Sequence, residues 1–146
     1  MARKASIPHP SISLAVQDWH VRRCFPQFKY RRDKGCWVGS LQPTEYSPVY
    51  QVRIDYRLHT VPKAWVLSPS IRMNAKHLHA DRSLCLYWPP DNSWTPQTLI
   101  AETIIPWTAE WLIFYEHWQI TDQWIGPEAP HRPKLAEPAK VKRQNI

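Results

Sequence analysis

Hydrophobic and polar residues alternate most regularly over residues 49–58, VYQVRIDYRL. One face of this segment carries only apolar or aromatic side chains: Tyr50, Val52, Ile54, Tyr56 and Leu58. A repeat of two residues indicates a β-strand with one buried face and one solvated face. We therefore expect a strand here, with its apolar face against the core.

Shorter patterns predict three more strands around this one. Residues 27–32 alternate, and residues 36–41 can return as the second strand of a hairpin. Gly35 fits the turn between them, because glycine accepts the positive φ that such turns require. Residues 63–71, KAWVLSPSI, form an apolar run that predicts a fourth strand ending at Pro69. The first half of the chain is therefore predicted to be an antiparallel meander.

Helical spacing occurs at both ends of this predicted meander. Residues 11–20, SISLAVQDWH, predict a short helix, and its apolar side consists of Leu14, Val16 and Trp19. Further along, Thr95 is a good N-cap, and Pro96 fits the first helical position. Pro106 is expected to break or kink this second helix, and Thr108 can restart it. The restarted helix has one apolar stripe, formed by Trp111, Leu112, Tyr115 and Trp118.

The order of these elements indicates an α+β protein, because strands are followed by helices without alternation. A length of 146 residues argues for a single domain. We expect that domain over residues 1–126, and a flexible Pro-rich, basic tail over residues 127–146. Nine Trp residues can fill a large core, whereas 15 Pro residues argue against long uninterrupted helices.

The net charge of +7 raises the question of a nucleic-acid partner. The basic residues are spread along the chain, which favours a solvated surface, and a partner with an acidic face fits equally well. We therefore expect no nucleic-acid partner. Residues 1–19 carry two basic residues but no long apolar run behind them, so we do not expect them to act as a signal peptide. No apolar run approaches the roughly 18 residues needed to span a membrane, so we expect a cytoplasmic protein.

The three cysteines do not form a disulfide framework, because their number is odd and their spacing irregular. In a reducing compartment they are expected to be thiols. We expect Cys24 and Cys36 to be buried. Cys85 lies in the irregular middle, in the stretch HLHADRSLCLYW that begins at His77.

The start of this stretch admits a metal-site interpretation. His77, His79 and Asp81 have the HxHxD spacing of binuclear zinc hydrolases, and a mononuclear site that includes Cys85 is conceivable. Against this, the next ligand position is Arg82, a permanent cation that would repel a metal. We therefore expect neither a metal nor another cofactor.

The end of the stretch admits an acyl-transfer interpretation, in which Cys85 is the nucleophile. The alternative is a small buried thiol between two leucines. The surrounding residues favour the nucleophile, because they resemble the ubiquitin-conjugating enzyme family. In that family a four-strand meander is followed by an Asn-containing element, a Cys-Leu nucleophile step and a Trp-x-Pro helix start. Here Leu84-Cys85-Leu86 and Trp94-Thr95-Pro96 match the last two elements.

The departures from the family pattern identify a branch. The family's oxyanion-stabilising Asn, eight residues before the cysteine, is replaced here by His77. The combination of HLHADRSLCLYWPP, a Trp-rich segment and a Trp-Ile-Gly end is similar to stand-alone bacterial ubiquitin-conjugating-like proteins of antiphage CBASS operons. That resemblance implies a UBC-like fold and a cGAS-like nucleotidyltransferase as partner, whose C-terminal tail is the acyl donor. It also implies activity without a dedicated activating enzyme.

Within this resemblance, Cys85 is expected to form a thioester. His77 and His79 are competing candidates for the oxyanion donor, and one of them could instead act as a base. Asp81 is expected to form a turn, and Trp94 to pack the cysteine loop against the first helix. Two other functions stay open: a non-catalytic binding module with the same fold, and a basic nucleic-acid binder.

Overall fold

The computed structural model describes residues 10–58, 60–87 and 93–127. Seven elements occur in these ranges, in the order α1 (Leu14–Cys24), β1 (Lys29–Arg31), β2 (Cys36–Leu41), β3 (Tyr50–Asp55), β4 (Lys63–Ser68), the 3₁₀ helix η2 (Ile100–Glu102) and α2 (Ile104–Thr121). The strands form one antiparallel sheet in the order β1-β2-β3-β4. The expected α+β class and UBC-like meander are therefore confirmed.

The two central strands follow the sequence pattern closely. Gly35 has the positive φ of 64° that the turn between β1 and β2 requires. β2 then pairs with β3 along its whole length, from Cys36 opposite Asp55 to Leu41 opposite Tyr50. The apolar residues of β3 and the following Tyr56 are buried, as expected. The prediction was wrong for Leu58, which lies beyond the strand and is exposed.

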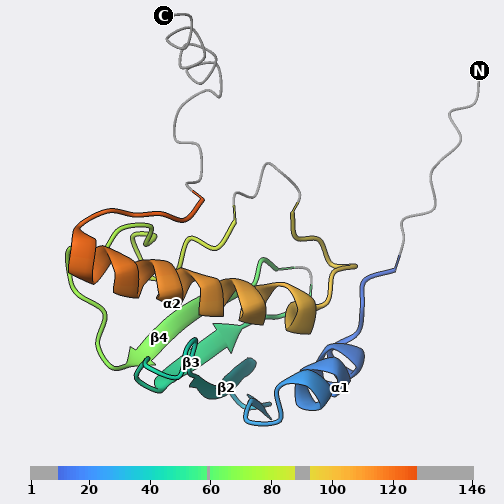
Figure 1. Cartoon of the computed structure of the whole chain (residues 1–146). Coiled ribbons are helices and arrows are strands. Elements are labelled where there is room, and N and C mark those ends of the chain that lie inside the picture. Colours follow the sequence, from blue (N-terminus) through green and yellow to red (C-terminus); the bar gives the residue numbers. More distant parts are fainter. Residues whose placement is uncertain (1–9, 59, 88–92, 128–146) are drawn as a thin grey trace, which may run out of the picture.

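α2 lies across one face of the sheet (Figure 1). The predicted stripe on this helix is buried in the core: Trp111, Leu112, Tyr115 and Trp118. A polar link supplements the apolar contact, because Glu116 accepts hydrogen bonds from Tyr50 Oη at 2.8 Å and from Ser47 Oγ at 2.9 Å. The helix is thus held against the sheet by both its apolar stripe and one carboxylate.

The break predicted at Pro106 was wrong. This proline lies inside α2, which runs for 18 residues from Ile104. It occupies the first turn, where backbone N–H groups have no partner within the helix, so its missing N–H costs nothing. Thr95 does not start a helix either. Its hydroxyl accepts from the N–H of Gln97 in a local turn instead.

The apolar side predicted for the first helix was correct for Leu14, which packs against the core, but wrong for its other two residues. In α1 both Val16 and Trp19 are about half exposed, whereas Gln17 and Val21 are fully buried. Gln17 is tolerated in the core because both ends of its amide have partners. Its Nε2 donates to the Thr98 carbonyl, and its Oε1 accepts from the Ile100 N–H, each at 2.9 Å.

The two cysteines expected to be buried differ. Cys36, in β2, is 1% exposed, which confirms that prediction. Cys24 is exposed, because it ends α1 on the side away from the core, so that prediction was wrong. The predicted tail over residues 127–146 lies, apart from Pro127, outside the described residues.

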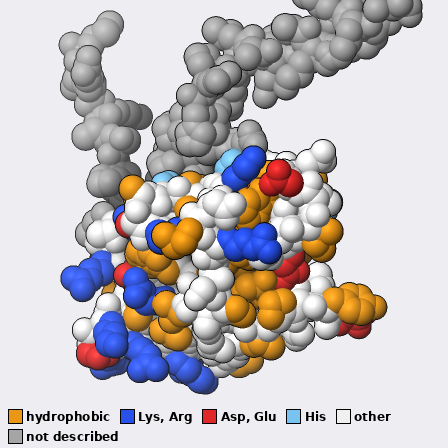
Figure 2. Space-filling model, turned by 90° about the vertical axis from the view of Figure 1, so that its left-hand side faces the viewer, with side chains coloured by type: hydrophobic (Ala, Val, Ile, Leu, Met, Phe, Trp, Pro, Cys, Tyr) orange, Lys and Arg blue, Asp and Glu red, His pale blue; other side chains and the backbone are white. Residues whose placement is uncertain are grey.

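Lys and Arg side chains gather at the lower left of the face shown in Figure 2, and others lie near its upper middle. Part of the described surface is therefore basic. No helix in residues 10–58, 60–87 or 93–127 is long and apolar enough to cross a membrane.

Candidate functional site

The predicted site residues other than Trp94 lie on a small β-hairpin that follows β4. The N–H of His79 donates to the Ser83 carbonyl, and the N–H of Cys85 donates to the His77 carbonyl, both at 2.9 Å. Between these two bonds, Leu78 and Leu84 form an antiparallel bridge. His77 and Cys85, which are eight residues apart in sequence, are therefore directly opposite each other.

The turn of this hairpin consists of three residues and ends at Arg82. The N–H of Arg82 donates to the His79 carbonyl at 2.8 Å, and its φ is 68°. Three-residue hairpin loops require a left-handed residue at this position, where glycine is the usual choice. The guanidinium of Arg82 also donates to the carbonyls of Ile71 and Arg72, at 3.2 and 3.3 Å. It thereby ties the turn to the segment that follows β4.

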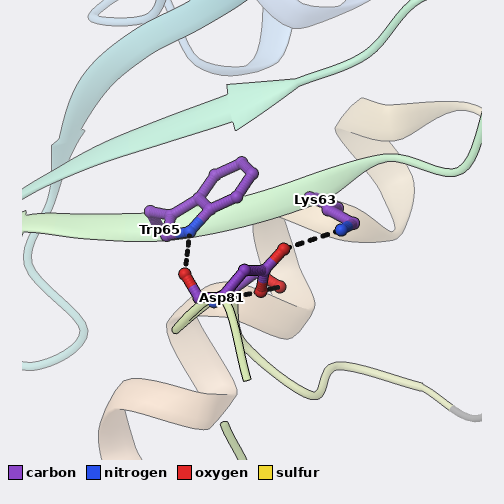
Figure 3. Close-up of polar contacts among 4 residues, drawn as sticks. Lys63, Trp65 and Asp81 are labelled. Atoms are coloured by element: carbon purple, nitrogen blue, oxygen red, sulfur yellow. Dashed lines mark hydrogen bonds and ion pairs between the residues drawn. The ribbon is translucent and has the colours of Figure 1, made fainter. Parts of the chain in front are cut away.

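Asp81 organises the same turn and joins it to the sheet. Its carboxylate accepts from the Ser83 N–H at 3.0 Å and from the Ser83 hydroxyl, and it pairs with Lys63 at 2.7 Å. The hydrogen bond from Lys63 holds the pKa of the Asp81 carboxyl well below its usual range, and Ser83 lowers it further. The Trp65 indole donates to the Asp81 carbonyl at 3.0 Å (Figure 3). Both sheet residues belong to β4.

A backbone contact completes the attachment of the hairpin. The N–H of Leu84 donates to the carbonyl of Ala64, in β4, at 2.9 Å. Leu84 is 4% exposed and belongs to the core, whereas its neighbour Cys85 is partly exposed. One residue of the hairpin thus anchors it to the core, and the next, Cys85, is only partly buried.

The surroundings of Cys85 favour the thiol over the thiolate. Burial raises the pKa of the Cys85 thiol, and the negative charge of Asp81 raises it further. The protonated thiol is therefore the dominant form at neutral pH. Such a sulfur reacts through a minor thiolate population, which has a high intrinsic nucleophilicity because its pKa is high.

His77 is held at both its backbone and its side chain. Its φ of 56° is left-handed, which is uncommon for a residue with a side chain. Its carbonyl accepts from Cys85 and also from the Trp111 indole at 3.1 Å. Its imidazole packs on the Trp124 ring, with centroids 4.5 Å apart. His77 thus links the cysteine hairpin to α2 and to the segment that follows it.

His79 has a different environment, because it is exposed and lines a surface pocket of about 390 Å³. The described walls of this pocket come from the start of β4 and from the hairpin, and they include Val61, Leu86 and Tyr87. Cys85 is not among these wall residues. The structure therefore separates the two candidate histidines, one held under an aromatic ring and the other open to solvent.

Trp94, the other supporting residue, is 8% exposed and lies in the core. Its ring meets the ring of Tyr56 edge to face, with centroids 5.3 Å apart. Neither the Trp94 indole N–H nor the Tyr56 hydroxyl has a hydrogen-bond partner in the part of the chain that the structure describes. Trp94 therefore packs against Tyr56, the residue that follows β3.

Among the described residues, no group of three or more His, Cys, Asp or Glu side chains is placed to hold a metal ion. The sequence analysis did not assign to the site four residues that help to fix the hairpin: Lys63, Trp65, Trp111 and Trp124. Arg82 was recognised only as a cation, because its hydrogen bonds to two carbonyls leave no signal in the sequence.

The model of one protein family, the type II CBASS E2 proteins, matches residues 17–132. This range contains the whole sheet, the cysteine hairpin and α2. A comparison with curated proteins finds no match to this chain. The family match covers most of the chain, so the protein belongs to the type II CBASS E2 family, which has an E2-like role in CBASS antiphage defence.

Proposed function

We propose that this protein is a ubiquitin-conjugating-like acyltransferase whose nucleophile is Cys85. In this proposal, Cys85 accepts the C-terminal acyl group of a partner protein as a thioester and transfers it to an amine or a thiol. The acyl donor is the C-terminal tail of a cGAS-like nucleotidyltransferase. Membership in a CBASS E2 family supports a partner from the same defence system.

The observation that carries this proposal is the place of Cys85. Its backbone is fixed by the bond to His77, its neighbour Leu84 is in the core, and Cys85 itself is partly exposed. A nucleophile for a protein tail needs a fixed backbone at a residue that is not sealed in the core. A cysteine that served only to fill the core would be buried, as Cys36 is.

The chemistry consists of two acyl-transfer steps. In the first, the Cys85 thiolate attacks the carbonyl carbon of a C-terminal acyl group that carries a phosphate or AMP leaving group, the C–S bond forms, and the phosphate or AMP departs. In the second, an amine attacks the thioester carbonyl, the C–S bond breaks, and the thiolate returns as the amine loses a proton. Both steps pass through a tetrahedral oxyanion, which needs a hydrogen-bond donor.

The separate environments of the two histidines support separate roles. His77 is opposite Cys85 and is held by Trp111 and Trp124, so it suits the oxyanion donor, a role that requires a fixed position. His79 is exposed, so it suits a base that exchanges protons with solvent and removes the proton of the attacking amine.

A non-catalytic binding module is the second candidate. The observation that favours it is the raised pKa of Cys85, which keeps the sulfur as a thiol at neutral pH. A module of this kind would hold the nucleotidyltransferase without forming a covalent bond. The two candidates differ in one observable, which is a covalent adduct that depends on Cys85.

The test is co-expression of the full chain with the nucleotidyltransferase, followed by nonreducing and reducing gels. We expect an adduct that disappears on reduction and is absent in Cys85→Ala. Cys24→Ala is the matched control, because Cys24 is an exposed cysteine that lies outside the hairpin. An adduct that persists in Cys85→Ala would end the proposal. A stable complex without any adduct would establish the binding module in its place.

A further inference from the structure

The segment that follows α2 turns back along the helix. α2 ends at Thr121 and is capped by Asp122, whose φ is 60° and whose N–H donates to the Trp118 carbonyl at 2.8 Å. Four residues later Gly126 lies against the Phe114 ring, where an added Cβ would be 2.2 Å from a ring carbon. Only glycine permits this approach, so the sequence places a glycine where the segment must touch α2.

Because the segment lies so close to α2, Trp124 contacts the cysteine hairpin. The centroid of the Trp124 ring lies 4.5 Å from the centroid of the His77 ring, and the angle between the two ring planes is 37°. On its other sides it contacts Trp111, with centroids 5.5 Å apart, and Phe114, with centroids 5.9 Å apart. Trp124 is thus wedged between two aromatic residues of α2 and the imidazole of His77.

Two tryptophans therefore hold one histidine at different points. Trp111 donates its indole N–H to the His77 carbonyl and fixes the backbone. Trp124 packs against the imidazole with the two rings tilted by 37°, and this contact restricts the plane of the imidazole ring. The left-handed backbone of His77 is an uncommon conformation that persists only where the surroundings enforce it. These contacts are such surroundings.

We propose that Trp124 is the positioning residue for the His77 imidazole during acyl transfer. The inference rests on the proposed function, in which His77 donates to the oxyanion. Donation requires an imidazole N–H aimed at the oxyanion, and the tilted contact with Trp124 restricts the plane in which both ring nitrogens point. The segment from Asp122 to Pro127 is then part of the site, although it lies more than 35 residues from Cys85 in sequence.

A double-mutant cycle tests this role on the transfer rate of the charged protein. Trp124→Leu keeps an apolar side chain but removes the aromatic face, and we expect transfer to be about tenfold slower, because misplaced catalytic groups cost one to two orders of magnitude. Trp124→Phe should restore most of the rate, because the Trp124 indole N–H has no described partner to lose. In a His77→Ala background, Trp124→Leu should have no further effect.

The matched control is Ile125→Ala, because Ile125 belongs to the same segment but is 57% exposed. It should transfer at the wild-type rate. A wild-type rate in Trp124→Leu, or equal slowing by Trp124→Leu with and without His77, would overturn the positioning role.

An NMR measurement on the uncharged protein separates this inference from the proposed function. A proton over an indole face is shifted upfield, so the His77 ring protons should move downfield in Trp124→Leu, while those of His79 stay in place. Unchanged His77 shifts would overturn the positioning role without reference to thioester chemistry. Failure of the wild-type chain to form a thioester, with the His77 shift observed, would overturn the proposed function alone.

Discussion

The Cys85 N–H donates to the His77 carbonyl at 2.9 Å, and that same carbonyl accepts from the Trp111 indole at 3.1 Å. One backbone oxygen thus connects the residue that carries the candidate nucleophile to a core residue of α2. A displacement of α2 would therefore also shift the backbone of Cys85. The hairpin is thus fixed directly to the core.

His77→Ala should slow transfer from the thioester by about a hundredfold, the usual cost of removing one oxyanion donor. Its carbonyl and the bond to Cys85 persist in this variant, because both belong to the backbone. His79→Ala should have a smaller effect at high pH, where solvent can act as the base. Single-turnover rates with pre-charged protein measure both effects. An unchanged rate in His77→Ala would assign the oxyanion to His79 or to backbone donors.

The alkylation of Cys85 should be slow at neutral pH and should still be rising above pH 9.0, the ordinary thiol pKa, because burial and Asp81 raise the Cys85 pKa above that value. Asp81→Asn removes the negative charge but keeps an oxygen that can accept from Ser83, so the pH profile should move to lower pH. Iodoacetamide rates at the Cys85 peptide, followed by mass spectrometry, give the profile. A short unstructured cysteine peptide is the reference, and an equal or lower midpoint for Cys85 would contradict the expected direction.

Arg82→Ala should destabilise the fold by about 1–2 kcal/mol, the range expected when hydrogen bonds from a charged group are lost. The affected bonds are those to the Ile71 and Arg72 carbonyls. Arg82→Gly loses the same bonds but removes the cost of the left-handed φ of 68°, so it should be more stable than Arg82→Ala. Urea unfolding measures the order. Equal stability of the two variants would show that the turn is not strained at this position.

Cys85→Ser should convert the reducible adduct into an oxyester, because an alkoxide is a poorer leaving group than a thiolate. The oxyester should survive reducing agent and be cleaved by mild alkali. The same nucleotidyltransferase preparation, applied to both proteins on one gel, makes the comparison. An adduct in Cys85→Ser that resists alkali would indicate an amide formed at another residue.

The sheet could be predicted from the sequence because its signals are local. The alternation in β3 results from the burial of every second side chain, and Gly35 occurs where the turn needs a positive φ. The prediction of the buried side of α1 failed because it considered only the hydrophobicity of the side chains and not their hydrogen bonds. Gln17 is buried because its amide bonds to two backbone groups that lie about 80 residues away. Such partners cannot be identified from a single sequence.

The candidate site was predictable in part for the same reason. The motif around Cys85 indicated which residues matter, whereas their support depends on residues from three other segments. Lys63 reaches the turn from β4, Trp111 reaches His77 from α2, and Trp124 reaches it from beyond that helix. Each of these contacts joins residues that are far apart in sequence, so it cannot be predicted from the spacing of residues along the chain.

The most direct test of the central claim is intact mass spectrometry of the protein purified with its nucleotidyltransferase under mildly acidic conditions. The thioester predicts a species with the summed mass of both chains less one water, which hydroxylamine splits at neutral pH. Peptide mapping should place the bond on the Cys85 sulfur. A covalent species linked through any other residue, or a mixture of unmodified chains alone, would contradict the claim.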